Sequence, residues 1–187
     1  PRVALLFHPS MATTLRGSAY QGFRAPTINE LFRRFQVRND VTAANDKLDP
    51  ERLTGGEVGL EHAFGRGVWA RLTGFWNEVE DSIANVTLPQ GQRLPDCPVP
   101  TTCRQRQNLD RTRIRGVEPE VRYRPTANWE LLASYLFVDA EVLEAANRPS
   151  LEGKRIAQVP RHQLTLGVRY ADPALINVSV QGRHVSD

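Results

Sequence analysis

Two neighbouring segments near the C-terminal end of the chain alternate apolar residues with polar or small ones at every second position. The first is "RHQLTLGVRY" (161–170) and the second spans residues 176–183. Because successive side chains of a β-strand point to opposite faces, this period of two predicts two strands, each with one apolar face. The stretch "ADPA" (171–174) between them is a short Pro-containing turn. The pair is therefore predicted to form a β-hairpin.

The hairpin pattern recurs along the chain, and short turns alternate with long polar segments. Further short turns are predicted at residues 8–14, 64–67 and 125–128, and the long polar segments are 24–53, 87–108 and 143–160. Compact soluble domains rarely contain several loops longer than about 12 to 15 residues. Membrane barrels have short periplasmic turns and long extracellular loops. We therefore predict an all-β fold, an antiparallel transmembrane β-barrel segment of about eight meander strands with this arrangement of turns and loops.

Aromatic residues gather near both ends of the predicted strands. Those beside the short turns are Phe64, Trp69, Tyr123, Trp129 and Tyr170, and those at the far ends are Phe75, Trp76, Tyr135 and Phe137. From Trp129 to Phe137, a strand tilted by about 40° covers roughly 20 Å of height. This height approximates the separation of the two aromatic girdles of a membrane barrel. A soluble β-sandwich also alternates and buries aromatic residues, so a soluble all-β binding module remains an alternative.

The composition argues against several other classes of protein. The chain has 187 residues and contains no run of about 18 apolar residues, which a transmembrane helix would need. Its formal net charge of +3 is modest and no nucleic-acid-binding module accompanies it, so we predict no nucleic-acid partner. The sequence has no His-Glu-x-x-His, nucleophile elbow, phosphate-binding loop or carboxylate pair at a defined spacing. We predict no enzymatic activity and no cofactor.

The two cysteines, Cys97 and Cys103, lie close together in "DCPVPTTC". The intervening residues include two prolines and make a small loop that a disulfide would close in an oxidising compartment. A zinc site would need two further ligands, and no histidine or third cysteine lies near the pair, so we predict no metal site. Two free thiols are the alternative to the disulfide.

The segment "LRGSAYQGFRAPTINELFRRFQVRNDVTAANDKLDPERLTGGEVGLE" (15–61) resembles the C-terminal half of the barrel in TonB-dependent outer-membrane receptors. The residues that match the motifs of this family are Gly22, Phe23, Arg24, Ala25, Pro26, Asn29, Glu30, Leu31, Asn45, Leu48, Pro50 and Glu51. Asp46 stands where the family usually has proline. The later "NLDRTRIRGVEPEVRYRP" (108–125) is also similar to this family, so the resemblance covers nearly the whole chain.

The resemblance implies a role in transport across the bacterial outer membrane. It implies uptake of a large scarce nutrient, such as a ferric siderophore or cobalamin, driven by the TonB complex through an N-terminal region. Residues 1–187 would be a partial barrel domain without the plug domain and the terminal strands, either an internal fragment or a truncated gene product. The chain would contact outer-membrane lipid and lipopolysaccharide. An autonomous small outer-membrane barrel, acting as an adhesin or channel, is the remaining alternative.

The motif around Pro26 is interpreted as a structural device at the rim of the barrel. Pro26 is expected in the first turn of a short helix with Thr27 near its cap, and Gly22 is expected to leave room beside the aromatic residues. Arg24 is expected to pair with Glu30, or with a carboxylate of the barrel interior such as Glu51 or Glu57. No histidine lies between Phe23 and Glu51, which argues against haem as the ligand, because haem iron needs an axial ligand.

Arginines of the long loops are the candidate ligand-binding residues, and they are Arg33, Arg34, Arg38, Arg104 and Arg106. The guanidinium group binds carboxylate and phosphate oxygens in a bidentate fashion, so anionic chelates or lipopolysaccharide phosphates would suit these side chains. The alternative is that these charges are only solvated.

Overall fold

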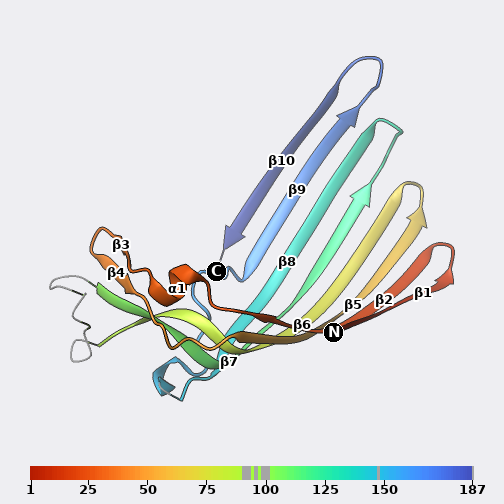
Figure 1. Ribbon diagram of the computed structural model, residues 1–187. Helices are drawn as coiled ribbons and strands as arrows, with labels where there is room; N and C mark the ends of the chain where they lie inside the picture. Colours follow the sequence, from red (N-terminus) through yellow and green to blue (C-terminus); the bar gives the residue numbers. More distant parts are fainter. Residues whose placement is uncertain (90–93, 95–96, 98–101, 147, 187) are drawn as a thin grey trace.

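The computed structural model describes residues 1–89, 94, 97, 102–146 and 148–186, and long antiparallel strands dominate it (Figure 1). The long strands are β1 (Arg2–Ser10), β2 (Thr13–Arg24), β5 (Glu51–Gly65), β6 (Val68–Thr87), β7 (Thr102–Tyr123), β8 (Trp129–Glu144), β9 (His162–Ala171) and β10 (Asn177–Ser186). The connections contain the short elements α1 (Ile28–Phe32), β3 (Phe35–Val37), β4 (Asp40–Ala43) and the 3-10 helix η2 (Pro149–Leu151).

Each long strand pairs with the next along the chain, in the order β1-β2-β5-β6-β7-β8-β9-β10. All of these pairs are antiparallel, which confirms the predicted meander. The short strands β3 and β4 lie off this path. In the described residues the sheet is open, because its order begins at β1 and ends at β10 without pairing between them. A barrel closed by this chain alone would need that pairing.

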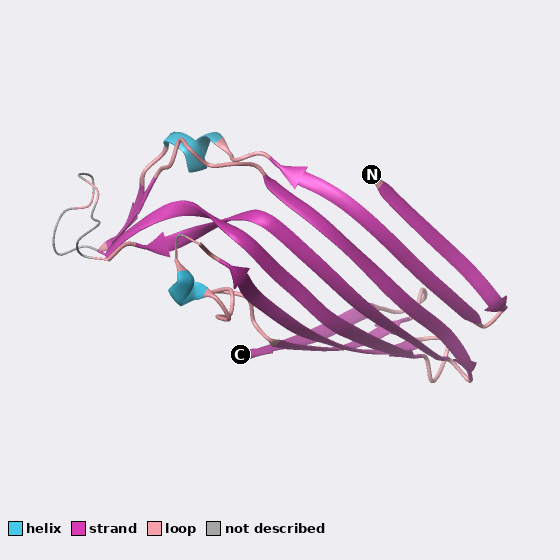
Figure 2. Cartoon of the chain, turned by 90° about the horizontal axis from the view of Figure 1, so that it is seen from below, coloured by secondary structure: helices cyan, strands magenta, loops and turns pink. Residues whose placement is uncertain are grey.

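The short turns lie at one end of the curved sheet, whereas α1, η2 and the long connections lie at the other (Figure 2). In the turn between β5 and β6, Gly67 has a φ of +76°, and a Cβ there would lie 2.1 Å from the carbonyl oxygen of Arg124, so only glycine fits. One predicted boundary is wrong. The segment 87–108 was expected to be a loop, but β7 begins at Thr102; residues 90–93, 95–96 and 98–101 of this segment lie outside the described part.

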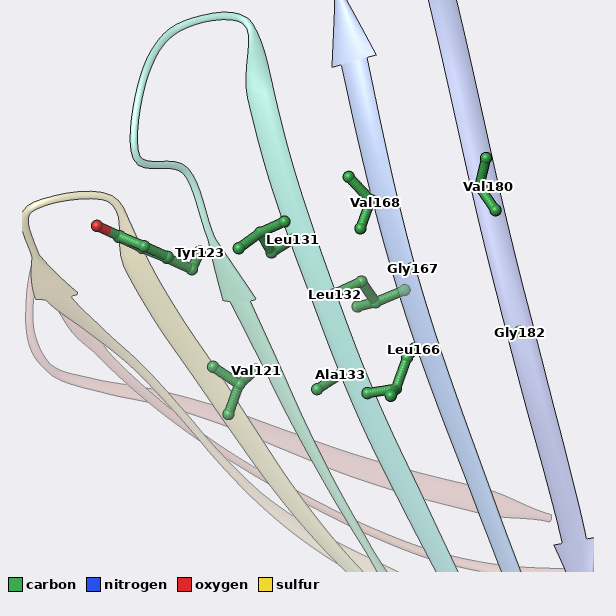
Figure 3. A pocket seen from close by; sticks show the side chains of 10 residues that line it. All are labelled: Val121, Tyr123, Leu131, Leu132, Ala133, Leu166, Gly167, Val168, Val180 and Gly182. Carbon is green, nitrogen blue, oxygen red and sulfur yellow. The ribbon is translucent and has the colours of Figure 1, made fainter.

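One face of the sheet carries most of the exposed large apolar side chains. The register of β2, β5 and β6 aligns Leu15, Leu60 and Leu72 in one row of this apolar face. The other exposed apolar residues of the same face include Val3, Leu5, Phe7, Val58, Val117, Val121, Leu131, Leu164, Leu166, Val168, Val178 and Val180. Figure 3 shows part of this face over β7 to β10, where a hollow of about 380 Å³ is lined by residues such as Val121, Leu131 and Leu166. Period-two alternation therefore places the apolar positions of successive strands on one continuous surface.

The opposite, polar face carries a network of ion pairs. Arg71 donates to Glu120 at 2.7 Å, and Arg122 donates to the same carboxylate at 2.6 Å. The guanidiniums of Arg71 and Arg122 also lie 5.3 and 4.9 Å from the ring centre of Trp69. The expectation that Trp69 belongs to an aromatic girdle is therefore wrong. Trp69 and Trp76 are an odd number of positions apart on β6, so only Trp76 points to the apolar face.

The buried apolar residues lie at the end of the sheet that carries the long connections, whereas the apolar face of the sheet stays exposed. One cluster consists of Val41, Leu88, Cys97 and Cys103, and a second of Val86, Leu109, Val142 and Ala145. Each joins strand ends to a long connection. Within the described part of the chain, the small core therefore lies only where the connections fold back on the strands. Among the described residues, no helix has the length and apolar character needed to cross a membrane.

Candidate functional site

The arginine at the end of β2 joins two carboxylates at the rim of the sheet. Arg24, the last residue of β2, lies opposite Glu51, the first residue of β5. Its Nε donates to Glu51, and its Nη1 donates to Glu30 Oε2 at 3.0 Å. Glu57, the third partner expected from the sequence, instead lies 3.7 Å from Arg2. Arg24 therefore fixes the start of the first long connection to the strand that follows it.

Helix α1 begins with a capping box. Thr27 is the N-cap, and its hydroxyl accepts from the backbone N–H of Glu30 at 3.3 Å, while Glu30 Oε2 accepts from the backbone N–H of Thr27 at 2.7 Å. The expected position of Thr27 is confirmed. Pro26 precedes the cap, so its expected place in the first turn is wrong. A Cβ at Gly22 would meet no atom within 4 Å, so Gly22 is not needed to make room for aromatic side chains.

The carboxylate of Glu30 is strongly stabilised in its charged form. Partial burial favours the neutral acid, but hydrogen bonds from the Thr27 backbone N–H, Arg24 and the Thr27 hydroxyl outweigh it and lower the pKa of Glu30 to about 2. Glu30 is therefore ionised at any physiological pH. Its charge is used to hold Arg24 and the helix start in place.

The first long connection folds back along the start of β7. Strand β4 pairs in parallel with the start of β7, which aligns Asp40–Ala43 with Thr102–Gln105. Farther along, Asn108 Nδ2 donates to the Asp49 carbonyl at 3.0 Å, and Asn108 Oδ1 accepts from the Asp49 N–H at the same distance. We call residues 25–50 and the described residues of 88–108 the loop layer, and the rest of the eight long strands the wall.

Arg106 connects α1 to β7. Its Nη1 donates to the carbonyls of Asn29 at 2.9 Å and Arg33 at 3.0 Å, which lie in the first turn of α1 and at its C-cap. The carbonyl of Arg106 in turn accepts from Asn45 Nδ2 at 2.9 Å. The Asn29 carbonyl also accepts from the Arg33 N–H, and a positive group near the C-terminal end of a helix interacts favourably with the carbonyls there. Arg106, predicted as a ligand contact, therefore acts in this structure as a brace.

A disulfide between Cys97 and Cys103 closes the second long connection next to β4. Both cysteines are buried and pack with Val41, which is fully buried, and with Leu88. The Leu88 N–H donates to the Cys103 carbonyl at 2.8 Å. The first and second long connections therefore share one small core.

The remaining arginine candidates divide into one that is paired and three that face solvent. Arg104 lies 3.3 Å from Asp40 across the β4–β7 pair. Arg33, Arg34 and Arg38 are exposed on the loop layer. Arg34 donates to Gln36 at 2.9 Å, and the carbonyl of Arg38 accepts from Gln36 Nε2 at 3.1 Å. The structure thus brings three of the five predicted arginines together on one outward-facing segment.

Exposed apolar side chains lie on the same segment, and they were not among the residues predicted from the sequence. Ile28 and Phe32 of α1 are 78% and 69% exposed, and Phe35 and Val37 of β3 are each 53% exposed. The signal was present, because Ile28 and Phe32 are four residues apart and share one face of a helix. Helix α1 has no buried residue. Exposed arginines and exposed apolar side chains on one short segment suit a large ligand with both anionic oxygens and apolar surface. The described residues contain no group of His, Cys, Asp and Glu that could hold a metal ion.

The whole chain matches one protein family. The family model described as "TonB dependent receptor-like, beta-barrel" matches residues 1–187. A curated relative, the iron-regulated outer membrane virulence protein of Vibrio cholerae serotype O1 (strain ATCC 39315 / El Tor Inaba N16961), is 29% identical over 168 residues, which are 87% of this chain and 25% of the relative. The chain therefore spans about a quarter of the length of the curated relatives that it matches.

Solved structures share the fold at low sequence identity. The siderophore receptor PirA from Acinetobacter baumannii has a TM-score of 0.67 and 15% identity, with 98% of this chain and 28% of that chain covered. The copper transporter OprC has a TM-score of 0.66 and 24% identity, with 92% and 24% covered. The FrpB iron transporter from Neisseria meningitidis has a TM-score of 0.62 and 18% identity, with 99% and 26% covered.

Proposed function

The chain belongs to the TonB-dependent receptor β-barrel family, whose members lie in the bacterial outer membrane, and we propose that it is part of a receptor that takes up a ferric siderophore. Residues 1–187 form one section of the barrel domain in this proposal. The apolar face of the wall contacts outer-membrane lipid and lipopolysaccharide, and the polar face lines the barrel interior. The loop layer then faces the outside of the cell.

The observation that carries this proposal is that Arg33, Arg34 and Arg38 are exposed on the same short segment as the exposed rings of Phe32 and Phe35. A siderophore surrounds ferric iron with hard, commonly anionic oxygen ligands on an organic scaffold. Guanidinium groups attract the oxygens, and aromatic rings cover the scaffold. The names of the similar proteins, an iron-regulated outer membrane protein and a siderophore receptor, favour an iron chelate over cobalamin.

In this proposal, other parts of the natural protein carry out the remaining steps of the transport cycle. A plug domain and an N-terminal segment that engages the TonB complex supply gating and energy in this proposal. The wall and loop layer supply the membrane passage and an outer ligand surface. We infer a transport role and no enzymatic one, in keeping with the receptors and transporters that share this fold.

Ligand binding by the natural protein that carries these residues tests the proposal. The variant R33Q/R34Q/R38Q would be compared with the control R66Q/R124Q/R169Q, which removes the same charge near the short-turn end. Outer membranes would be titrated with a panel of radiolabelled ferric siderophores and with cobalamin. We expect one siderophore class to bind, and to bind roughly tenfold more weakly to the first variant only. Binding of cobalamin alone, or equal siderophore binding by both variants, would contradict the proposal.

A further inference from the structure

The apolar face of the wall ends abruptly along one cross-strand row. The register aligns Gly74, Val117 and Phe137 in one row of this face. Two positions closer to the loop layer, the same register aligns Trp76, Arg115 and Asp139. A change from apolar to charged side chains between adjacent rows of one face, with a Trp in the charged row, is expected where a barrel leaves the hydrocarbon and enters the headgroup region.

A hollow lies across this boundary. It has a volume of about 690 Å³, and its lining includes Arg115, Asp139 and Arg161 at the charged end and Gly74, Val117 and Phe137 at the apolar end. A second hollow of about 500 Å³ shares Gly74 and Val117 with the first and continues over Leu60 and Leu72. The space is open because Gly74 has no side chain; a Cβ there would meet only Val58, at 3.9 Å. Together the hollows form a groove with a charged end toward the loop layer and an apolar end toward the short turns.

The charged end of the groove has an excess of positive charge. Arg115 donates from both Nε and Nη2 to one oxygen of Asp139, at 3.0 and 2.9 Å. Arg161 approaches the other oxygen only to 3.7 Å, which is longer than a hydrogen bond. Two guanidiniums therefore share one carboxylate. The side chains of Arg115 and Arg161 are 52% and 40% exposed, whereas Asp139 is 20% exposed. The next row toward the loop layer contains two carboxylates and one arginine, Glu78, Arg113 and Glu141, so the excess of positive charge is confined to the row of Arg115.

We propose that this groove binds a phosphorylated lipid of the outer leaflet, with a phosphate between Arg115 and Arg161 and an acyl chain along Gly74 and Val117. The inference rests on the proposed function only for the orientation that turns the loop layer to the outside. Guanidinium groups bind phosphate oxygens through paired hydrogen bonds. The charged end of the groove, toward the loop layer, matches the headgroup of such a lipid, and the apolar end, toward the short turns, matches its acyl chains. In a bacterial outer membrane, the phosphorylated lipid of that leaflet is lipopolysaccharide.

Lipid binding by the purified natural protein tests this inference. The protein would be stripped of lipid in mild detergent and titrated with purified lipopolysaccharide, with the same lipid after phosphate removal, and with inorganic phosphate, and bound lipid would be counted by native mass spectrometry. We expect lipopolysaccharide to bind, its dephosphorylated form to bind at least about tenfold more weakly, and R115Q/R161Q to lose a similar factor. The control R66Q/R124Q, at the short-turn end, is expected to bind as the wild type does.

A second variant keeps the test informative if R115Q/R161Q fails to fold. D139N removes the carboxylate that competes for the two arginines, so it is expected to bind lipopolysaccharide more tightly than the wild type. Unchanged binding by a folded R115Q/R161Q or by D139N would overturn the inference, as would displacement of the lipid by millimolar inorganic phosphate. Siderophore binding by R115Q/R161Q is expected to stay at the wild-type level, so failure here and failure of the transport proposal are separate results.

Discussion

The wall and the loop layer are held together in different ways. The wall relies on backbone ladders between neighbouring strands, and it leaves side chains such as Leu166 and Val168 exposed on its apolar face. The loop layer has little regular structure, and it relies on individual contacts: the capping box of α1, the Arg106 brace and the Cys97–Cys103 disulfide. In our proposal the membrane stabilises the wall, whereas specific side chains stabilise the loop layer. Substitutions should therefore act through lipid in one region and through single bonds in the other.

The largest effect is expected from a charge on the apolar face of the wall. Leu166 lies opposite Ala133, between the aromatic row of Trp129 and Tyr170 and the row of Phe137 and His162. Leu166→Arg should lower the free energy of unfolding by about 2 to 4 kcal/mol, because an arginine near the bilayer midplane is poorly solvated. Urea unfolding in lipid vesicles measures the change. Thr165→Arg on the polar face is the matched control, and an equal loss in both variants would remove the distinction between the faces.

Removal of the disulfide should loosen the loop layer and leave the wall intact. The substitution C97S/C103S opens a small loop, for which chain entropy predicts a loss of about 2 kcal/mol. Hydrogen exchange should accelerate in residues 34–50, because β4 packs on this disulfide through Val41, and should stay unchanged in β9 and β10. Faster exchange throughout the wall would show that the two regions are not independent.

A smaller effect is expected at the start of α1. Thr27→Ala removes the hydroxyl that accepts from the Glu30 N–H, and the loss of an N-cap costs about 1 kcal/mol. Amide exchange in residues 28–33 should accelerate, with Thr126→Ala in the turn before β8 as the control. A variant with unchanged exchange would show that Arg24 and Arg106 hold the helix without its cap.

The last prediction is a pH dependence of the same helix, which is confined to acid conditions. The pKa of Glu30 is lowered from an ordinary value of 4.5 to about 2, so the charged carboxylate favours the folded loop layer. That stabilisation is fully present above about pH 4.5 and is lost as the pH falls through 2. The protection of the α1 amides, taken relative to the intrinsic exchange rate at each pH, should fall over this window in the wild type. Glu30→Gln should show no such change, and an equal acid response in both proteins would assign it to another group.

The period-two pattern was enough to predict the wall, because strand alternation and turn length are local properties of the sequence. It gave the wrong face for Trp69, because closeness to a turn was weighed above the odd spacing between Trp69 and Trp76. The loop layer was harder to predict. The roles of Arg106 and Asn108 depend on contacts with residues far away in the sequence, and no local pattern reports such contacts. The positions of Thr27 at the cap and of Glu30 in the first turn could be predicted, because helix starts have local sequence motifs.

The central claim is that one face of the wall contacts lipid and the other faces the barrel interior. Single cysteines at consecutive positions of β9, from Gln163 to Arg169, would carry a nitroxide label in the natural protein in lipid vesicles. Collision rates with oxygen, which concentrates in lipid, and with a water-soluble nickel complex measure the surroundings of each label. We predict high oxygen collision at Leu164, Leu166 and Val168 and low values at the positions between them. Equal rates along the strand, or the opposite alternation, would contradict the claim.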